Sequence, residues 1–251
     1  MRTCTFSLSL AAIFTTMAVP SFAETNYREF DLNSFKLGMK KEVYMPLIKE
    51  TCIYNRNGFT ALRTYDVGET KIKGARRFVC RASLEEEIDI FTSDGFGIMQ
   101  IIRSKKIPLP ENLPDNEKYN NLLAIRDKIS EKYGAPTISK TAAPDSYFFA
   151  NVGKNTFPWN VNSSHAKAVS CWGDCSDSET DTDGVINLKG SGAMAVLVPY
   201  PQSIYLYQIL IDRAAIEKTE AEFTRKEQEA QNAQEKKAVE DAKRSVENIK
   251  L

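Results

Sequence analysis

Alternating acidic residues near position 180 form the segment whose residue types could most directly bind a metal ion. Glu179, Asp181 and Asp183, followed by Gly184, resemble the first half of a calcium loop, in which oxygen ligands alternate before a glycine turn. The pattern then fails, because Gly190 stands where such loops place a bidentate glutamate. We therefore interpret the segment as a solvated acidic loop and predict no metal site, with Glu179, Asp181 and Asp183 as the calcium alternative.

Catalytic patterns are absent from the sequence. The chain has 1 histidine, His165, and the adjacent Ser163 and Ser164 do not by themselves make a triad. No Gly-x-Ser-x-Gly elbow and no glycine-rich phosphate loop is present. A copper or zinc site from Cys171, Cys175 and His165 would lack a fourth ligand. We predict no catalytic residue, no cofactor and no enzymatic activity.

The N-terminal segment predicts export. Residues 1–23 have a basic start, an uncharged apolar stretch and the small-residue site Pro20-Ser-Phe-Ala23, which is typical of a secretory signal peptide. The stretch is too short and too interrupted to span a membrane as a helix. We expect a periplasmic or secreted product that starts at Glu24.

Export changes the expected chemistry of the cysteines. Of 5 cysteines, Cys4 lies in the predicted signal, and the other 4 would enter an oxidising compartment, where disulfides are the default. Four cysteines allow three pairings. We favour Cys52 with Cys80 and Cys171 with Cys175, because each pair lies within one local segment.

Charge is balanced overall but unevenly distributed. The chain has 33 basic and 33 acidic residues, which argues against a general nucleic-acid binder. Residues 36–106 carry 14 basic and 9 acidic groups (net +5), whereas residues 107–212 carry 8 and 12 (net −4). Five basic residues of the positive half could meet an anionic partner or could be scattered solvated side chains: Lys71, Lys73, Arg76, Arg77 and Arg81.

The predicted helices and strands that must position these residues repeat one order, in which a helix is followed by several strands. Residues 40–49 show a helical apolar face, with Pro46 predicting a kink or early stop, and strand-like runs follow at 58–65, 76–82, 86–93 and 96–102. Three prolines between 108 and 114 mark a boundary. A second helix at 116–133 and strands at 146–151, 167–172, 193–198 and 204–211 then repeat the order. The predicted fold class is α+β.

We accordingly divide the chain into a signal peptide (1–23), two units of one helix plus an antiparallel sheet (24–110 and 111–212), and a polar C-terminal helix (213–251). The last segment has no glycine or proline and contains 9 basic and 9 acidic residues. Its short apolar series are out of register with each other, so a solvated helix is favoured over a self-associating one. Removing residues 213–251 is expected to leave a folded core.

Two short motifs carry a family resemblance. Leu37-Gly-Met-Lys-Lys-Glu-Val43 and Lys132-Tyr-Gly-Ala-Pro136 resemble a helix start and a helix end in small bacterial envelope proteins of the outer-membrane-assembly lipoprotein and β-lactamase-inhibitor-protein type. The resemblance implies helices packed on an antiparallel sheet, sometimes in tandem, and a protein-binding or envelope-accessory role. The chain departs from the lipoproteins because no lipid-accepting cysteine follows the predicted cleavage site.

Together these observations predict an exported, disulfide-stabilised, non-enzymatic protein-binding or envelope-accessory protein. Its partner would be another envelope or secreted protein, with no nucleic acid and no membrane span, and homo-oligomerisation through the C-terminal helix stays open. The alternative is a calcium-binding or cell-wall-directed ligand-binding module or enzyme.

Overall fold

The computed structural model describes residues 26–54, 61–141, 168–174, 178–180, 186–188, 190–200 and 202–247. Its centre is one eight-stranded antiparallel sheet in the order β1-β2-β3-β4-β10-β9-β6-β5, and β7 and β8 pair as a separate two-stranded antiparallel sheet. The strands are β1 (Leu62–Tyr65), β2 (Arg76–Ser83), β3 (Glu86–Ser93), β4 (Gly97–Pro108), β5 (Ile138–Thr141), β6 (Ala168–Gly173), β7 (Ser178–Thr180), β8 (Ile186–Leu188), β9 (Gly192–Tyr200) and β10 (Ser203–Ile211).

The predicted α+β class is confirmed, and both helix-then-strand runs contribute to the same sheet. The first run supplies β1 to β4 as one half and the second supplies β10, β9, β6 and β5 as the other half. The halves join where β4 pairs with β10, from Pro108 opposite Ser203 to Gln100 opposite Ile211. This seam makes the sheet continuous, so neither half has a free edge at its centre.

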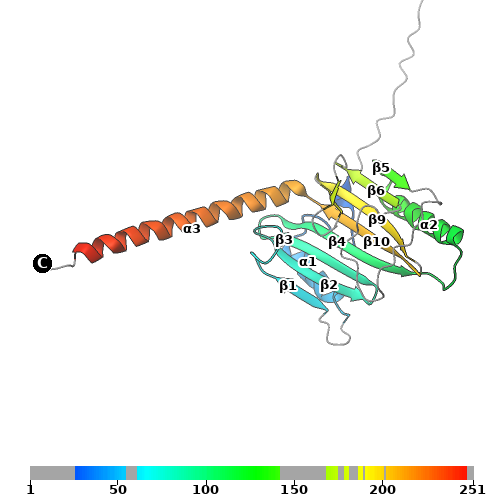
Figure 1. Ribbon diagram of the computed structural model, residues 1–251, viewed down its shortest axis with the longest axis horizontal. Helices are drawn as coiled ribbons and strands as arrows, with labels where there is room; N and C mark the ends of the chain where they lie inside the picture. Colours follow the sequence, from blue (N-terminus) through cyan, green and yellow to red (C-terminus); the bar gives the residue numbers. More distant parts are fainter. Residues whose placement is uncertain are drawn as a thin grey trace, which may run out of the picture.

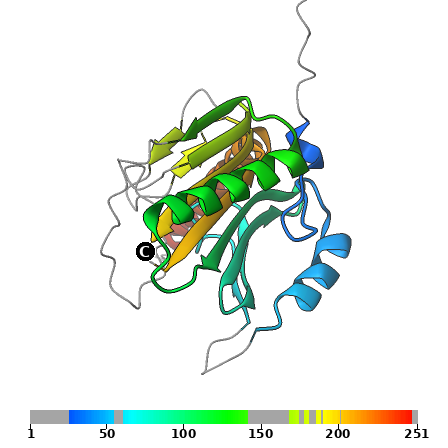
Figure 2. The same ribbon diagram turned by 90° about the vertical axis from the view of Figure 1, so that its right-hand side faces the viewer.

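Helices α1 (Lys41–Thr51) and α2 (Asp115–Tyr133) cover the same face of the sheet, over opposite halves, as Figure 2 shows. We call this face the helix face. Tyr44 and Ile48 of α1 and Leu122 of α2 are buried in one apolar cluster with Ile88 and Ile90 of β3. Helix α1 continues through Pro46, although the proline predicted a kink or early stop, since Tyr44 and Ile48 anchor it on either side of that position.

The first of the two motifs forms a short join between the chain and the sheet. Gly38 N–H donates to the Ile98 carbonyl oxygen at 2.7 Å, and Ile98 N–H donates back to the Met39 carbonyl oxygen at 3.0 Å. Gly38 takes a φ of +78°, which favours glycine. The motif therefore fixes where α1 begins relative to β4.

The second motif forms the end of α2. Gly134, with a φ of +83°, follows the last helical residue. Tyr133 packs on Phe30, and its hydroxyl donates to the Asp31 carbonyl oxygen at 2.6 Å. Trp172 Nε1 donates to the Gly134 carbonyl oxygen at 3.0 Å. These contacts tie α2 to β6 and to the N-terminal segment, which contains the short 3₁₀ helix η1 (Tyr27–Glu29).

Helix α3 (Arg213–Glu247) begins on the opposite face, which we call the α3 face, and then projects away from the sheet (Figure 1). Ala215 and Ile216 are buried in a second apolar cluster with Phe91 and Ile209. Every residue from Thr224 to Arg244 is exposed. The first turns of α3 therefore pack on the sheet, whereas residues 224–244 are exposed to solvent.

Several strands differ from those predicted from the sequence, and two predicted segments fall outside the described residues. Strand β4 extends to Pro108, whereas the sequence predicted an end at residue 102. Strands β5, β7 and β8 were not predicted at all. The strand expected at 146–151 lies outside the described residues, as does the predicted signal peptide.

Candidate functional site

Strand β3 carries acidic side chains on both faces of the sheet. Glu86 lies on the helix face, in register with Lys105 of β4, whereas Glu87 and Asp89 lie on the α3 face. Glu86, Glu87 and Asp89 are all buried. Because a buried carboxylate is costly unless it is paired, each one must have partners.

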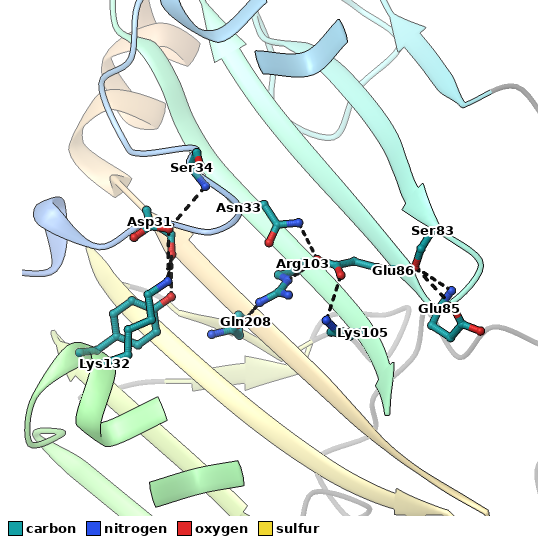
Figure 3. Close-up of polar contacts among 11 residues, drawn as sticks. Asp31, Asn33, Ser34, Ser83, Glu85, Glu86, Arg103, Lys105, Lys132 and Gln208 are labelled. Atoms are coloured by element: carbon teal, nitrogen blue, oxygen red, sulfur yellow. Dashed lines mark hydrogen bonds and ion pairs between the residues drawn. The ribbon is translucent and has the colours of Figure 1, made fainter. Parts of the chain in front are cut away.

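Glu86 is the centre of a polar cluster between the two helices, shown in Figure 3. Arg103 Nε donates to Glu86 Oε1 at 2.7 Å, and Asn33 Nδ2 donates to the same oxygen at 2.6 Å. Lys105 Nζ lies 3.2 Å from Glu86 Oε2. Arg103 Nη1 also donates to Gln208 Oε1 at 2.7 Å, which links β4 to β10 across the seam. We call these five residues the seam cluster.

Three separate parts of the chain build the seam cluster. Asn33 and Ser34 have φ values of +53° and +70°, as in the tight turns that asparagine favours, and the flanking Leu32 and Phe35 hydrogen-bond to each other. Both flanking residues are buried in the core, so the turn is held in place. It thereby presents Asn33 to the sheet, where β3, β4 and β10 supply the other members.

The electrostatics of the seam cluster favour an ionised Glu86. Burial raises the pKa of Glu86, but hydrogen bonding and charge from Arg103, together with Asn33 and Lys105, outweigh burial and leave the pKa below its ordinary value. One carboxylate faces two cations, so the cluster has one positive charge in excess.

The α3 face carries two further buried carboxylates, and each accepts a hydrogen bond from an arginine. Arg77 Nε donates to Asp89 Oδ1 at 2.8 Å, and Arg81 Nη2 donates to Glu87 Oε2 at 3.2 Å. Arg77 also lies over the rings of Tyr65 and Phe91, 5.2 and 5.5 Å from their centroids. In each pair the carboxylate balances the positive charge of its arginine.

Glu87 is nevertheless incompletely satisfied. Its Oε1 and the hydroxyl of Ser104, which lies opposite Glu87 on β4, are both buried and have no hydrogen-bond partner among the described residues. Burial raises the pKa of Glu87, and the hydrogen bond from Arg81 only partly opposes that rise. Next to Ser104 on this face, burial also raises the pKa of Tyr207.

The five predicted anionic-partner residues do not behave as one patch of unpaired charge. Arg77 and Arg81 pair with buried carboxylates, and Arg76 lies 3.8 Å from Asp94. Lys71 and Lys73 are exposed. A surface for an anionic partner at these positions stays a prediction.

The cysteine prediction is confirmed for one pair. Cys52 and Cys80 form a disulfide that joins the end of α1 to β2. Cys171 is also disulfide-bonded, and Cys175 lies outside the described residues. Of the calcium candidates, Glu179 lies in β7, and Asp181 and Asp183 lie outside the described residues, as does His165.

The seam cluster was missed by sequence reasoning. Glu86, Arg103 and Lys105 belong to none of the motifs or candidate sites identified in the sequence. A signal was present, because Arg103 and Lys105 share one side of a strand that is otherwise apolar on that side. Charged residues on a core-facing side of a strand require partners.

The described residues show neither a metal-ligand cluster nor a membrane-spanning helix, and they line one small cavity. Within them, no group of three or more His, Cys, Asp or Glu side chains is placed to hold a metal ion. A small cavity beside Gln208, lined by Phe30, Tyr133 and Trp172, has room for about one water molecule. No helix among the described residues has the length and apolar character needed to cross a membrane.

Comparison with known proteins does not identify a family: no family model, no curated protein and no solved structure matches this chain. The resemblance to envelope proteins of the outer-membrane-assembly lipoprotein and β-lactamase-inhibitor-protein type therefore stays a prediction.

Proposed function

We propose that this chain is an exported, non-enzymatic protein-binding protein and that the projecting part of α3 contacts another envelope or secreted protein. The observation that carries the proposal is the exposure of α3 from Thr224 to Arg244, beyond the turns that pack on the sheet (Figure 1). At 1.5 Å per residue this arm extends roughly 30 Å from the body.

An isolated polar helix gains little stability in water, so an arm of this length needs either local ion pairs or a partner. Ion pairs are present: Lys226 lies 2.7 Å from Glu222, and Arg225 lies 2.6 Å from Glu229. Exposed pairs of this kind stabilise a helix by only about 0.3–0.5 kcal/mol each. Contact with a partner would supply the packing that the arm lacks.

The disulfide supports the exported part of the proposal. The Cys52–Cys80 bond is expected in an oxidising compartment and unusual in a reducing one. N-terminal sequencing of the protein purified from the periplasm or medium should give Glu24 as its first residue. Recovery of a chain that retains residues 1–23 from the cytoplasm alone would contradict export.

The arm is tested by a chain that ends after Thr224. This variant keeps the packed turns of α3, so its body should fold with an unchanged melting temperature. Chemical crosslinking in the native envelope should give a product with the full chain that is absent with the shortened chain. The crosslinked protein, once purified, should bind the full chain at least about tenfold more tightly than the shortened one.

Sedimentation of the purified full chain separates a heterologous partner from a second copy. A monomer at micromolar concentration is expected, because the apolar positions of the arm are few and alanine-rich. A dimer that is lost on truncation would replace the heterologous partner with self-association. Equal crosslinking by both chains would contradict a role for the arm.

A further inference from the structure

The seam cluster contains hydrogen-bond donors that have no acceptor among the described residues. Within the described part of the chain, the guanidinium of Arg103 has no acceptor beyond Glu86 and Gln208, and Lys105 Nζ has none beyond Glu86. Nη2 of Arg103 and two protons of Lys105 are therefore free to bind another acceptor. Both side chains reach solvent, since Arg103 is 16% and Lys105 40% exposed.

This arrangement differs from the ion pairs on the other face. There, Arg77 pairs with Asp89 and Arg81 pairs with Glu87, whereas Arg103 and Lys105 share Glu86. The excess charge on the helix face lies between α1 and α2, where Figure 3 shows Arg103 and Lys105 converging on Glu86. A second acceptor carrying one negative charge would balance the cluster.

The two cations are held in place before any ligand arrives. Arg103 is fixed by Glu86 on one side and by Gln208 on the other, and Gln208 is 4% exposed. Lys105 lies two residues further along the same side of β4, roughly 7 Å away along the strand. Fixed donors lose little conformational entropy on binding, unlike the long side chains of an open surface.

We propose that Arg103 and Lys105 form a recognition site for a carboxylate group carried by a partner protein. Arginine binds carboxylates through paired N–H donors, and the lysine adds a charge-assisted bond. A carboxylate is favoured over a phosphate because the site has one excess positive charge, and because Glu86 would repel a second negative charge. The proposal rests on the proposed protein-binding role and goes beyond it, because it adds a second contact on the helix face, opposite the face on which α3 begins.

The test uses small probes, so it does not depend on whether the α3 arm binds anything. Acetate, chloride and inorganic phosphate are titrated at matched ionic strength into the full-length mature chain, and the side-chain Nε–H signal of Arg103 is followed by NMR. Acetate should produce a saturable shift of this signal. Lys105→Ala should weaken acetate binding at least about fivefold, through loss of one charge-assisted bond.

Lys106→Ala is the matched control, because Lys106 is the next residue on β4 and its side chain points to the opposite face. It should leave acetate binding unchanged. Lys105→Gln, which keeps most of the side-chain stem, replaces Lys105→Ala if the alanine variant melts lower than the parent chain.

Each other outcome overturns the proposal. An equal shift with chloride would mean general screening, and tighter binding of phosphate than acetate would rule out carboxylate selectivity. Unchanged acetate binding in both Lys105 variants would show that Arg103 and Lys105 do not form the proposed carboxylate site. Loss of the site would leave the arm proposal intact, because that proposal is tested by truncation.

Discussion

At the scale of single residues, Glu86 and Glu87 show how neighbours on one strand acquire opposite properties. Their side chains point to opposite faces, which alternation along a strand predicts. The partners were not predictable, because Asn33 lies 53 residues from Glu86 in sequence and Arg103 lies 17 residues away. As a result, the pKa of Glu86 is lowered and the pKa of Glu87 is raised.

The opposite pKa shifts of Glu86 and Glu87 predict that the stability changes caused by Glu86→Gln and Glu87→Gln depend on pH in opposite ways. Because the folded pKa of Glu86 is lowered, its contribution to stability is present above its unfolded pKa, near 4.5, and is lost as pH falls through the folded value. Glu86→Gln should therefore lower the free energy of unfolding by about 1.5–3 kcal/mol at pH 7 and by less near pH 3. Urea unfolding at both pH values measures this difference.

Glu87→Gln should behave in the reverse manner. The raised folded pKa means that the contribution of Glu87 is greatest below pH 4.5 and declines as pH rises through the folded value. The variant should therefore gain stability relative to the parent chain between pH 4 and pH 7, measured by the same urea series. Parallel pH profiles for Glu86→Gln and Glu87→Gln would contradict both assignments.

At the scale of elements, the two motifs that carry the family resemblance have structural roles. Gly38 and Met39 pair with Ile98, and Gly134 ends α2 against Trp172. Helices were predictable because their apolar periodicity and end signals are local. The short strands β5, β7 and β8 were missed, since strands of three or four residues leave too little alternation to detect.

Gly97 should be the least replaceable glycine of this join. It has a φ of +74°, and a Cβ there would collide with the Met39 carbonyl oxygen, which is backbone and cannot move alone. Gly97→Ala should lower the free energy of unfolding by more than about 2 kcal/mol. Gly95→Ala is the control, because nothing lies within 4 Å of an added Cβ there. Equal chemical-denaturation midpoints for the two variants would show that the join does not constrain β4.

At the scale of the whole molecule, the sequence predicted two helix-plus-sheet runs but not their union. The seam pairs residues such as Ile102 and Ile209, which are more than 100 positions apart, and no local pattern specifies such a pairing. The charge division also persists in space, because the net-positive residues 36–106 form the β1–β4 half of the sheet. Long-range pairing therefore decides the architecture that local patterns leave open.

The buried core includes the first turns of α3. The sequence predicted that residues 213–251 could be removed, but Ile216 is 1% exposed, and Gly74 lies so close to the helix that an added Cβ would be 3.0 Å from Phe223 Cβ. A chain ending at Asp212 would expose the apolar side chains beneath these turns. It should lose more than about 3 kcal/mol of unfolding free energy.

A chain ending after Thr224 should instead lose less than about 0.5 kcal/mol, because it removes only exposed residues. The comparison requires guanidinium unfolding with the Cys52–Cys80 disulfide intact, so that only the helix differs between the chains. Equal stability of the two truncated chains would show that the first turns of α3 contribute nothing to the core. In that case the docked base could not orient the arm, and the arm would sample directions freely when it meets a partner.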